Sequence, residues 1–250
     1  MSTRRYRGVV VGALALVVGL NGCANDPLPT PGASSKQTSA AAESSSTESE
    51  AQPPSGAVRY LSLGDSLTEG IGAADLDTGT FPALLAAKWR AAGCEVELQN
   101  VGISGYTAGQ VLSDEVPSIA DFKPTVITFQ AGGNDIANSV SLEEYKKNVK
   151  AVLDAATDSG AKVVVLAQNE WFRSPDGQNY GENAAAQRVD FDAALIAEAN
   201  AHGAQFVDMR PLYKQQADEG QWVDDGLHPT PEAYEAWAEG LAEAVPAPCK

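Results

Sequence analysis

A serine flanked by glycines is the first residue of this sequence that suits a chemical role. Ser66 lies in segment 64–70 (Gly-Asp-Ser-Leu-Thr-Glu-Gly), directly after a short apolar run. A serine between a strand and the following turn exposes its hydroxyl at a helix N-terminus, where it acts as a nucleophile if a base accepts its proton. Gly-Asp-Ser is also common as a plain turn or helix cap, so the assignment needs partners elsewhere in the chain.

Three later segments carry groups that suit such a serine. Segment 100–105 (Asn-Val-Gly-Ile-Ser-Gly) contains Gly102, which can offer an unobstructed backbone N–H. Segment 132–135 (Gly-Gly-Asn-Asp) contains Asn134, whose amide can approach closely because two glycines precede it. Segment 225–229 (Asp-Gly-Leu-His-Pro) supplies a carboxylate and an imidazole. A hydroxyl, hydrogen-bond donors and an imidazole are the groups that nucleophilic catalysis combines.

The elements that must position these segments alternate from Ala57 onward. Short runs that are apolar along most of their length, as strands covered on both faces are, predict five strands over residues 58–63, 96–101, 125–131, 162–168 and 205–209. Helices are expected over residues 81–92, 108–116, 142–159, 184–201 and 231–245. This alternation predicts an α/β fold in which a parallel sheet lies between two layers of helices. Ligands of such sheets bind at the carboxyl ends of the strands, which is where the first three segments lie.

Together the four segments resemble the sequence blocks of the SGNH hydrolases, also called the GDSL esterase and lipase family. The match consists of Gly-Asp-Ser-Leu at 64–67, Gly102, Gly-x-Asn-Asp at 132–135 and Asp-x-x-His at 225–228, in the family's order and spacing. It covers about residues 57–245 and is most similar to the branch of bacterial thioesterase I and lysophospholipase L1-like esterases. The resemblance implies a flavodoxin-like, three-layer α/β/α fold with a five-stranded parallel sheet, and a hydrolase domain over residues 57–250.

The resemblance also implies a serine esterase that cleaves acyl esters through an acyl-enzyme intermediate, with Ser66 as the nucleophile. The sequence contains two histidines. His202 lies at a helix end just before the last strand, opposite the reactive edge, which leaves His228 as the base. Asp224 and Asp225 are both close enough in sequence to orient His228, and the family spacing selects Asp225.

Three donors are expected to stabilise the oxyanion: the backbone N–H groups of Ser66 and Gly102 and the side-chain amide of Asn134. Asp65 and Asp135 are expected to be structural, accepting hydrogen bonds from nearby backbone N–H groups. No cofactor is expected. A metal site is not expected either, because no two histidines lie at ligand spacing and the cysteines are far apart in sequence.

The loop over residues 169–183 follows the fourth predicted strand and carries several aromatic residues. We predict that Trp171 and Phe172 wall the pocket for the acyl or alcohol part of the substrate. The alternative is that these side chains cover the core beneath a long loop. The sequence leaves the substrate open among lysophospholipids, acylated cell-envelope sugars and short-chain esters.

The N-terminal residues 1–22 have the pattern of an export signal, with three arginines before an apolar stretch that is too short to span a bilayer comfortably. The sequence at 20–23 (Leu-Asn-Gly-Cys) resembles the bacterial lipobox, which implies lipidation of Cys23 and anchoring to the extracytoplasmic side of the cell membrane. The alternative is an ordinary secretory peptide. Residues 23–56 are rich in Ser, Pro and Ala and are expected to form a disordered tether.

A disulfide is predicted between Cys94 and Cys249. If Cys23 is lipidated, these are the remaining thiols of a domain exported to an oxidising compartment. In a parallel sheet of flavodoxin-like order, the final helix ends at the amino edge of the strands, where Cys94 begins the second strand. The alternative is two unpaired cysteines.

The composition bounds the other classes of function. The 250 residues carry a net charge of −16, with 44% hydrophobic and 20% charged residues, which is ordinary for a globular domain. The sequence has no run of 18 apolar residues, which excludes a polytopic membrane protein, and the acidic balance argues against nucleic-acid binding. We expect a monomer that acts on a small acyl ester. The rival class is a non-catalytic substrate-binding or adhesive surface lipoprotein, which would have no need of the nucleophile, base and oxyanion set.

Overall fold

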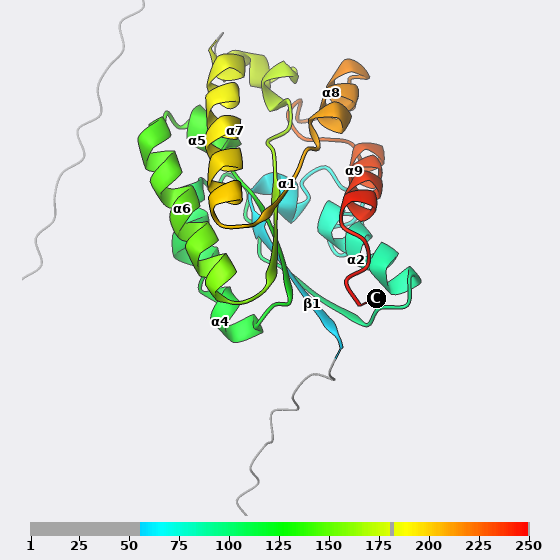
Figure 1. Ribbon diagram of the computed structural model, residues 1–250. Coiled ribbons are helices and arrows are strands. Elements are labelled where there is room, and N and C mark those ends of the chain that lie inside the picture. Colours follow the sequence, from blue (N-terminus) through cyan, green and yellow to red (C-terminus); the bar gives the residue numbers. More distant parts are fainter. Residues whose placement is uncertain (1–55, 181–182, 250) are drawn as a thin grey trace, which may run out of the picture. The chain divides into compact units, whose positions relative to one another are not determined.

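A parallel sheet of five strands forms the centre of the computed structural model, which describes residues 56–180 and 183–249 (Figure 1). The strands are β1 (Val58–Gly64), β2 (Val96–Asn100), β3 (Val126–Gln130), β4 (Lys162–Leu166) and β5 (Gln205–Val207). They lie in the order β2-β1-β3-β4-β5, and every neighbouring pair is parallel. This flavodoxin-like order confirms the predicted fold class. The strand ends differ from the prediction by one or two residues, because the last apolar residues already belong to the loops.

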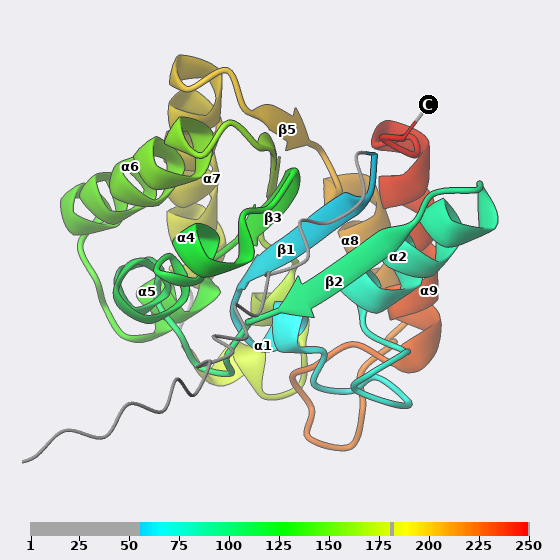
Figure 2. The ribbon, with the colours of Figure 1, turned by 90° about the horizontal axis from the view of Figure 1, so that it is seen from below.

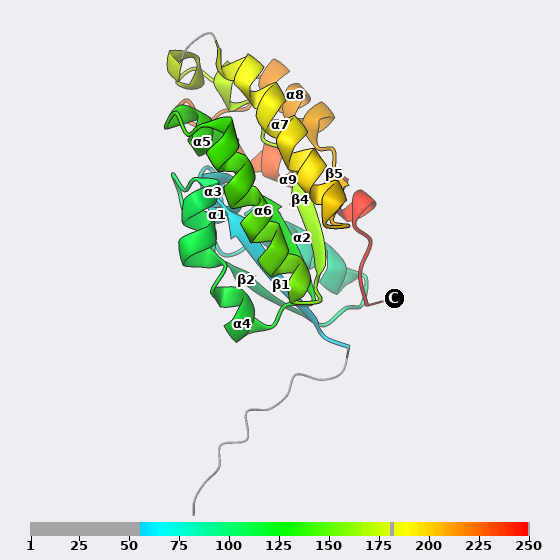
Figure 3. The ribbon, with the colours of Figure 1, turned by 60° about the vertical axis from the view of Figure 1, so that its left-hand side comes forward.

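Helices cover both faces of the sheet (Figures 1 and 3). One face carries α3 (Ala108–Gln110), the π-helical turn η1 (Val111–Glu115), α4 (Ser118–Phe122), α5 (Gly133–Ala137), α6 (Leu142–Asp158) and α7 (Ala184–Ala201). The other face carries α2 (Phe81–Ala91), α8 (Arg210–Asp218) and α9 (Pro231–Ala244). The short helix α1 (Ser66–Glu69) follows β1, and the 3-10 turns η2 (Trp171–Arg173) and η3 (Gly177–Tyr180) follow β4.

The two-residue period of β1 explains why this strand builds two cores. Leu61 and Leu63 point into the core beneath α6 and α7, whereas Val58 and Tyr60 point into the core beneath α2 and α9. Figure 2 shows the strands between these two groups of helices. Because both faces of the sheet are covered, the central strands β3 and β4 are buried along nearly all of their length, whereas the edge strands β2 and β5 are not.

Several helical elements differ from the sequence expectation, and the short helices α4 and α5 were not expected. The single helix expected over residues 108–116 is instead α3 followed by η1, and the π-helical turn carries the buried side chain of Glu115. Helix α8 was not expected, because it is mostly polar and buries only Tyr213 and Gln216, so its apolar pattern is weak.

The predicted disulfide between Cys94 and Cys249 is confirmed, with a Cα–Cα distance of 5.6 Å and a sequence separation of 155 residues. It joins the start of β2 to the chain that follows α9, at the amino edge of the sheet. Helix α9 packs beside α2, and the Trp89 indole N–H donates to the Val245 carbonyl at 3.0 Å.

The predicted export signal over residues 1–22, the lipidated Cys23 and the tether up to residue 55 lie outside the described residues. Within residues 56–180 and 183–249, no helix is both long and apolar enough to cross a membrane.

Candidate active site

The end of β1 places Ser66 at the carboxyl edge of the sheet. Strand order reverses between β1 and β3, so the loops after these two strands diverge and leave a crevice in which ligands of such sheets bind. A Cβ at Gly64 would overlap the Gln130 carbonyl oxygen, so only glycine lets β1 run this close to β3 before the turn. Asp65 then caps α1, because its Oδ1 accepts the Leu67 N–H at 3.0 Å. Ser66 therefore occupies the first turn of α1.

Two segments that are distant in sequence meet at this edge, one with Ser66 and the other with Asp225 and His228. His228 Nε2 lies 2.9 Å from Ser66 Oγ, and His228 Nδ1 lies 2.6 Å from Asp225 Oδ2. The Asp225 carboxylate can only accept, so Nδ1 carries a proton and Nε2 of the neutral ring accepts from the Ser66 hydroxyl. The structure thus brings together the predicted nucleophile, base and orienting acid.

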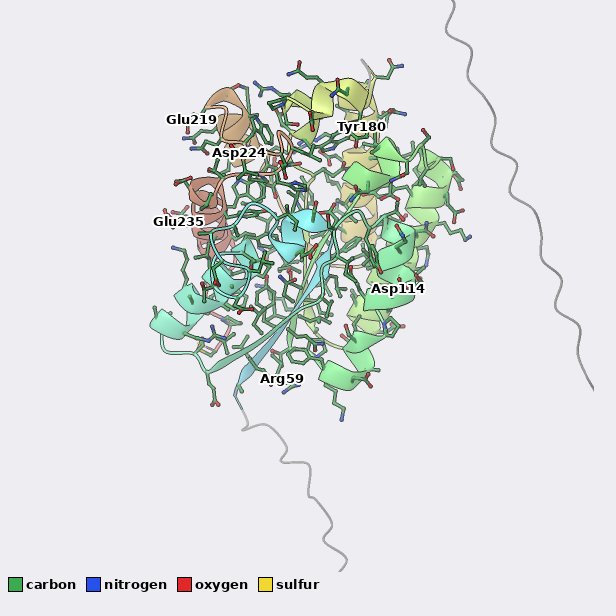
Figure 4. All side chains as sticks on the ribbon, turned by 180° about the vertical axis from the view of Figure 1, so that it is seen from behind. Arg59, Asp114, Tyr180, Glu219, Asp224 and Glu235 are labelled. Carbon is green, nitrogen blue, oxygen red and sulfur yellow. A yellow bond between two sulfur atoms is a disulfide. The ribbon has the colours of Figure 1, made fainter. Side chains whose placement is uncertain are left out.

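The loop between α8 and α9 selects Asp225 over Asp224. Asp225 Oδ1 accepts the backbone N–H groups of Leu227 at 2.8 Å and His228 at 3.0 Å. Partial burial raises the pKa of Asp225, but the hydrogen bonds from His228 and Leu227 lower it more, so its pKa lies below the ordinary value. Asp224 lies in the same loop, at the end of the domain where Tyr180 also lies (Figure 4). Among the described residues it has no hydrogen bond to His228.

His202 lies where the sequence predicted, at the C-cap of α7. Its Nδ1 lies 2.7 Å from the Glu198 carbonyl and its Nε2 lies 2.8 Å from Asp154 Oδ1. The hydrogen bond to Asp154 raises the pKa of His202. Both ring nitrogens therefore have a partner, one on α6 and one on α7, so His202 belongs to the helical layer.

The three expected oxyanion donors differ in the hydrogen bonds that they already make. The Ser66 backbone N–H has no backbone or side-chain acceptor among the described residues. Asn134 lines the same cavity as Ser66, and its amide donates to the Tyr106 carbonyl at 3.0 Å and to Asp65 Oδ2 at 3.5 Å. The Gly102 N–H donates to Asn100 Oδ1 at 3.2 Å, and Gly102 is not among the residues that line this cavity. Gly102 thus serves as a donor only where an oxyanion competes with Asn100 for its N–H.

Buried carboxyl groups lie beneath the nucleophile. Asp65 caps α1 and Asp135 Oδ2 accepts the Ala108 N–H at 2.9 Å, so both have the structural contacts that were predicted. The sequence analysis missed Glu115, whose Oε2 accepts the Gly64 N–H at 2.8 Å. Burial raises the pKa of Asp65 to about 7, of Glu115 to about 8 and of Asp135 to about 6. The sequence holds a signal for Glu115. It lies four residues after Val111 and four before Ile119, on the same helix face, and both of these residues are buried.

A cavity opens in front of Ser66 and His228, and its wall mixes polar and apolar groups. Its lining comprises the segment after β1, the Gly-Gly-Asn-Asp turn, the residues after β4 and the loop before α9: Asp65, Ser66, Leu67, Gln130, Gly133, Asn134, Ala137, Gln168, Asn169, Trp171, Tyr180, Leu227 and His228. Trp171 is in this wall, as predicted. Phe172, also predicted there, is not among the lining residues: its ring packs against the core, with its centroid 6.2 Å from that of the Trp171 ring.

The residues after β4 contribute a polar wall that the sequence analysis did not identify. Gln168 and Asn169 are almost fully buried, and neither amide has a hydrogen-bond partner among the described residues. A buried ion pair on α7 fixes this segment: Arg188 donates to the Gln168 carbonyl at 2.9 Å and lies 2.9 Å from Asp192. The available signal was the Arg-x-x-x-Asp spacing at 188–192 within a helix that is otherwise rich in alanine.

The chain is similar in sequence to known proteins. The sequence matches the model of the GDSL-like Lipase/Acylhydrolase family over residues 62–236. An arylesterase of Vibrio mimicus is 29% identical over 190 residues, which cover 75% of this chain and 88% of the arylesterase. Esterase TesA of Pseudomonas aeruginosa is 29% identical over 174 residues, covering 68% of this chain and 78% of TesA.

Solved structures show the same arrangement of strands and helices. A crystal structure of TesA superimposes with a TM-score of 0.64 at 25% identity, covering 77% of this chain and 99% of TesA. A variant of Axe2, an acetylxylan esterase of Geobacillus stearothermophilus, gives a TM-score of 0.64 at 16% identity, covering 77% of this chain and 95% of Axe2. At that identity the likeness to Axe2 concerns the fold alone.

Proposed function

Since the chain belongs to the GDSL-like lipase/acylhydrolase family and is a carboxylic ester hydrolase, we propose that Ser66, His228 and Asp225 carry its reaction. The observation that supports this assignment is the continuous hydrogen-bonded path from Ser66 Oγ through the imidazole to the Asp225 carboxylate. A binding or adhesive protein has no need of this path.

The geometry assigns each proton a route. His228 Nε2 takes the proton of Ser66 Oγ as the oxygen attacks the ester carbonyl, and Asp225 stabilises the imidazolium that forms. His228 then gives this proton to the departing alkoxide, which leaves as the alcohol, and the acyl group stays bound to Ser66 Oγ. A water molecule attacks the acyl-enzyme and passes a proton to His228, which returns it to Ser66 Oγ as the carboxylic acid leaves.

Charge that develops on the carbonyl oxygen needs donors already in place. Ser66 and Asn134 line the cavity, and we assign the Ser66 N–H and the Asn134 amide as the principal donors, the amide in competition with its hydrogen bonds to Tyr106 and Asp65. The Gly102 N–H is the third, in competition with its hydrogen bond to Asn100. Loss of one such donor typically lowers turnover by about 10²–10³.

A short or polar acyl group fits this cavity better than a long hydrocarbon chain. Gln168 and Asn169 place buried amide groups without partners among the described residues in its wall, and contact with an alkyl chain would keep them from hydrogen-bonding partners. The name of one similar protein, an arylesterase, agrees with an ester substrate that has no long hydrocarbon chain. We therefore propose short-chain acyl esters as the substrate class.

We also propose that the protein is exported and held at the cell envelope by a lipid on Cys23. The support is the signal pattern of residues 1–22 and the lipobox-like sequence at 20–23. The disulfide between Cys94 and Cys249 suits an oxidising compartment. Metabolic labelling with a radioactive fatty acid tests the anchor: wild type should incorporate label and Cys23→Ala should not. Equal labelling of the two would refute it.

The reaction is tested by hydrolysis of p-nitrophenyl acetate and butyrate. Wild-type protein should hydrolyse both esters, and Ser66→Ala should reduce turnover to the level of the uncatalysed reaction. Ser113→Ala is a suitable control, because Ser113 is an exposed serine on η1 that is not among the residues lining the cavity. If wild type and Ser66→Ala hydrolyse both esters at the same rate, the assignment of the nucleophile is wrong.

A further inference from the structure

Glu115 is a buried acid for which ester hydrolysis as described above has no use. Its residue is 1% exposed, and it forms no ion pair within the described residues. Burial of an acid without a cation is costly, whereas an apolar side chain of similar size would be stabilised there by its neighbours Val111 and Ile119. The side chain must therefore satisfy a group that an apolar residue cannot.

That group is the backbone N–H of Gly64. On the β2 side of β1, the Ser62 carbonyl accepts the Val101 N–H at 3.1 Å and the Gly64 carbonyl accepts the Ile103 N–H at 3.2 Å. The Gly64 N–H faces the same side, but β2 has ended at Asn100 and the chain is leaving the sheet. Glu115 Oε2 fills the vacant ladder position and accepts this N–H at 2.8 Å. Without it, a buried N–H would have no partner.

Gly64 links this carboxyl to the loop that carries Gly102. Glu115 Oε2 accepts the Gly64 N–H, and the Gly64 carbonyl accepts the N–H of Ile103, which directly follows Gly102. Gly64 is also two residues before Ser66. Glu115 therefore holds the residue at which the nucleophile segment meets the loop that carries one expected oxyanion donor.

A second carboxylate holds the outer part of this loop against α1. Glu69 Oε2 accepts the Ser104 N–H at 2.6 Å, and Asn100 Nδ2 donates to the Thr68 carbonyl at 2.7 Å. Of Glu69, Asn100 and Glu115, Glu115 is the buried side chain and the one that accepts from Gly64. Its position on a π-helical turn is typical of residues whose side chain must be aimed at a functional site.

We propose that Glu115 is a positioning residue for ester hydrolysis, which holds the end of β1 and loop 101–105 together so that the Ser66 hydroxyl and the oxyanion donors converge on one substrate oxygen. This inference rests on the proposed function. Its requirement is a hydrogen-bond acceptor at Oε2, so glutamine should replace glutamate and leucine should not.

The test compares Glu115→Gln, Glu115→Leu and Glu115→Asp in the full chain, with p-nitrophenyl acetate as the substrate. Glu115→Gln should keep kcat within about threefold of wild type, because it keeps the acceptor. Glu115→Leu should lower kcat by about 30-fold or more, with KM changed by less than about threefold, because an interaction that matters in the transition state is lost. Glu115→Asp, which is one methylene too short to reach Gly64, should behave like leucine and serves if Glu115→Leu fails to fold.

Val152→Ala is the matched control for general destabilisation, since Val152 is fully buried in the same core on α6. It should lower the melting temperature and leave kcat unchanged well below that temperature. The inference is overturned if Glu115→Leu and Glu115→Asp retain the kcat of Val152→Ala, or if Glu115→Gln loses as much as they do. Ser66→Ala separates the two levels: if it retains wild-type turnover, the proposed function itself fails.

Discussion

Asp225 holds His228 at two points, since its Oδ1 accepts the His228 backbone N–H at 3.0 Å and its Oδ2 lies 2.6 Å from the imidazole Nδ1. The backbone contact fixes the loop and the side-chain contact fixes the ring. Because one carboxylate makes both contacts, Asp225 orients the His228 ring that faces Ser66.

Asp225→Asn should therefore lower kcat by about 10³–10⁴ with little change in fold, because an amide can donate to Nδ1 and favour the wrong tautomer of His228. The matched control is Asp224→Asn, which makes the same change one residue away and should keep wild-type kcat. Steady-state hydrolysis of p-nitrophenyl butyrate measures both. Equal activity of the two variants would exclude Asp225 as the orienting acid.

The cavity wall yields a prediction on chain length. Trp171→Ala should change the ratio of kcat/KM for acetate and longer acyl esters by about tenfold, because one methylene in a pocket is worth about 1–3 kcal/mol. Phe172→Ala removes an adjacent aromatic ring that packs against the core, so it should lower stability and leave this ratio unchanged. An unchanged ratio in Trp171→Ala would remove η2 from the site.

Stability should fall as the pH rises from about 5 to about 8. Burial raises the pKa of Asp65 to about 7, of Glu115 to about 8 and of Asp135 to about 6, so the folded state binds more protons than the unfolded state in this window. The free energy of unfolding must then decrease with pH, by about 3 kcal/mol for Glu115 alone. His202, whose pKa is also raised, acts in the same direction, whereas Asp225, with its lowered pKa, contributes a loss only at acid pH.

Urea denaturation of wild type and Glu115→Gln at several pH values checks this prediction. Glutamine does not titrate, so the variant should show a shallower decrease of the unfolding free energy with pH. Parallel curves for the two proteins would mean that Glu115 does not titrate between pH 5 and 8.

The sequence was sufficient for the parts of the structure that depend on pattern and order. Short runs, several of them apolar along their whole length, predicted the covered parallel sheet, and the topology of such a sheet placed Cys94 beside Cys249. The four blocks located Ser66 and His228 because the carboxyl ends of parallel strands converge. These features follow from local periodicity and chain direction, which a sequence displays.

The sequence was insufficient where a polar side chain is matched to a distant backbone group. Glu115 looked like one residue of an amphipathic helix, because the vacant ladder position at Gly64 exists only in the folded sheet. Trp171 and Phe172 are neighbours in sequence and pack against the same core, yet only Trp171 is among the residues that line the cavity. The N–H of Gly102 was expected to be free, and its hydrogen bond to Asn100 depends on how the loop leaves β2.

The disulfide gives the last prediction, in which stability and activity separate. Cys94 and Cys249 lie at the amino edge of the sheet, and the triad lies at the carboxyl edge, so the bond closes 155 residues without contacting the site. Its loss should destabilise the fold by about 2–5 kcal/mol, since closure of a long loop restricts the unfolded chain. Cys94→Ser combined with Cys249→Ser should therefore lower the melting temperature by roughly 5–15 °C, while kcat at 25 °C stays within about twofold of wild type. Reduction of wild type with dithiothreitol should reproduce the thermal shift and leave the double variant unaffected. A loss of kcat in the double variant below its melting temperature would show that the amino edge is coupled to the site, against this assignment.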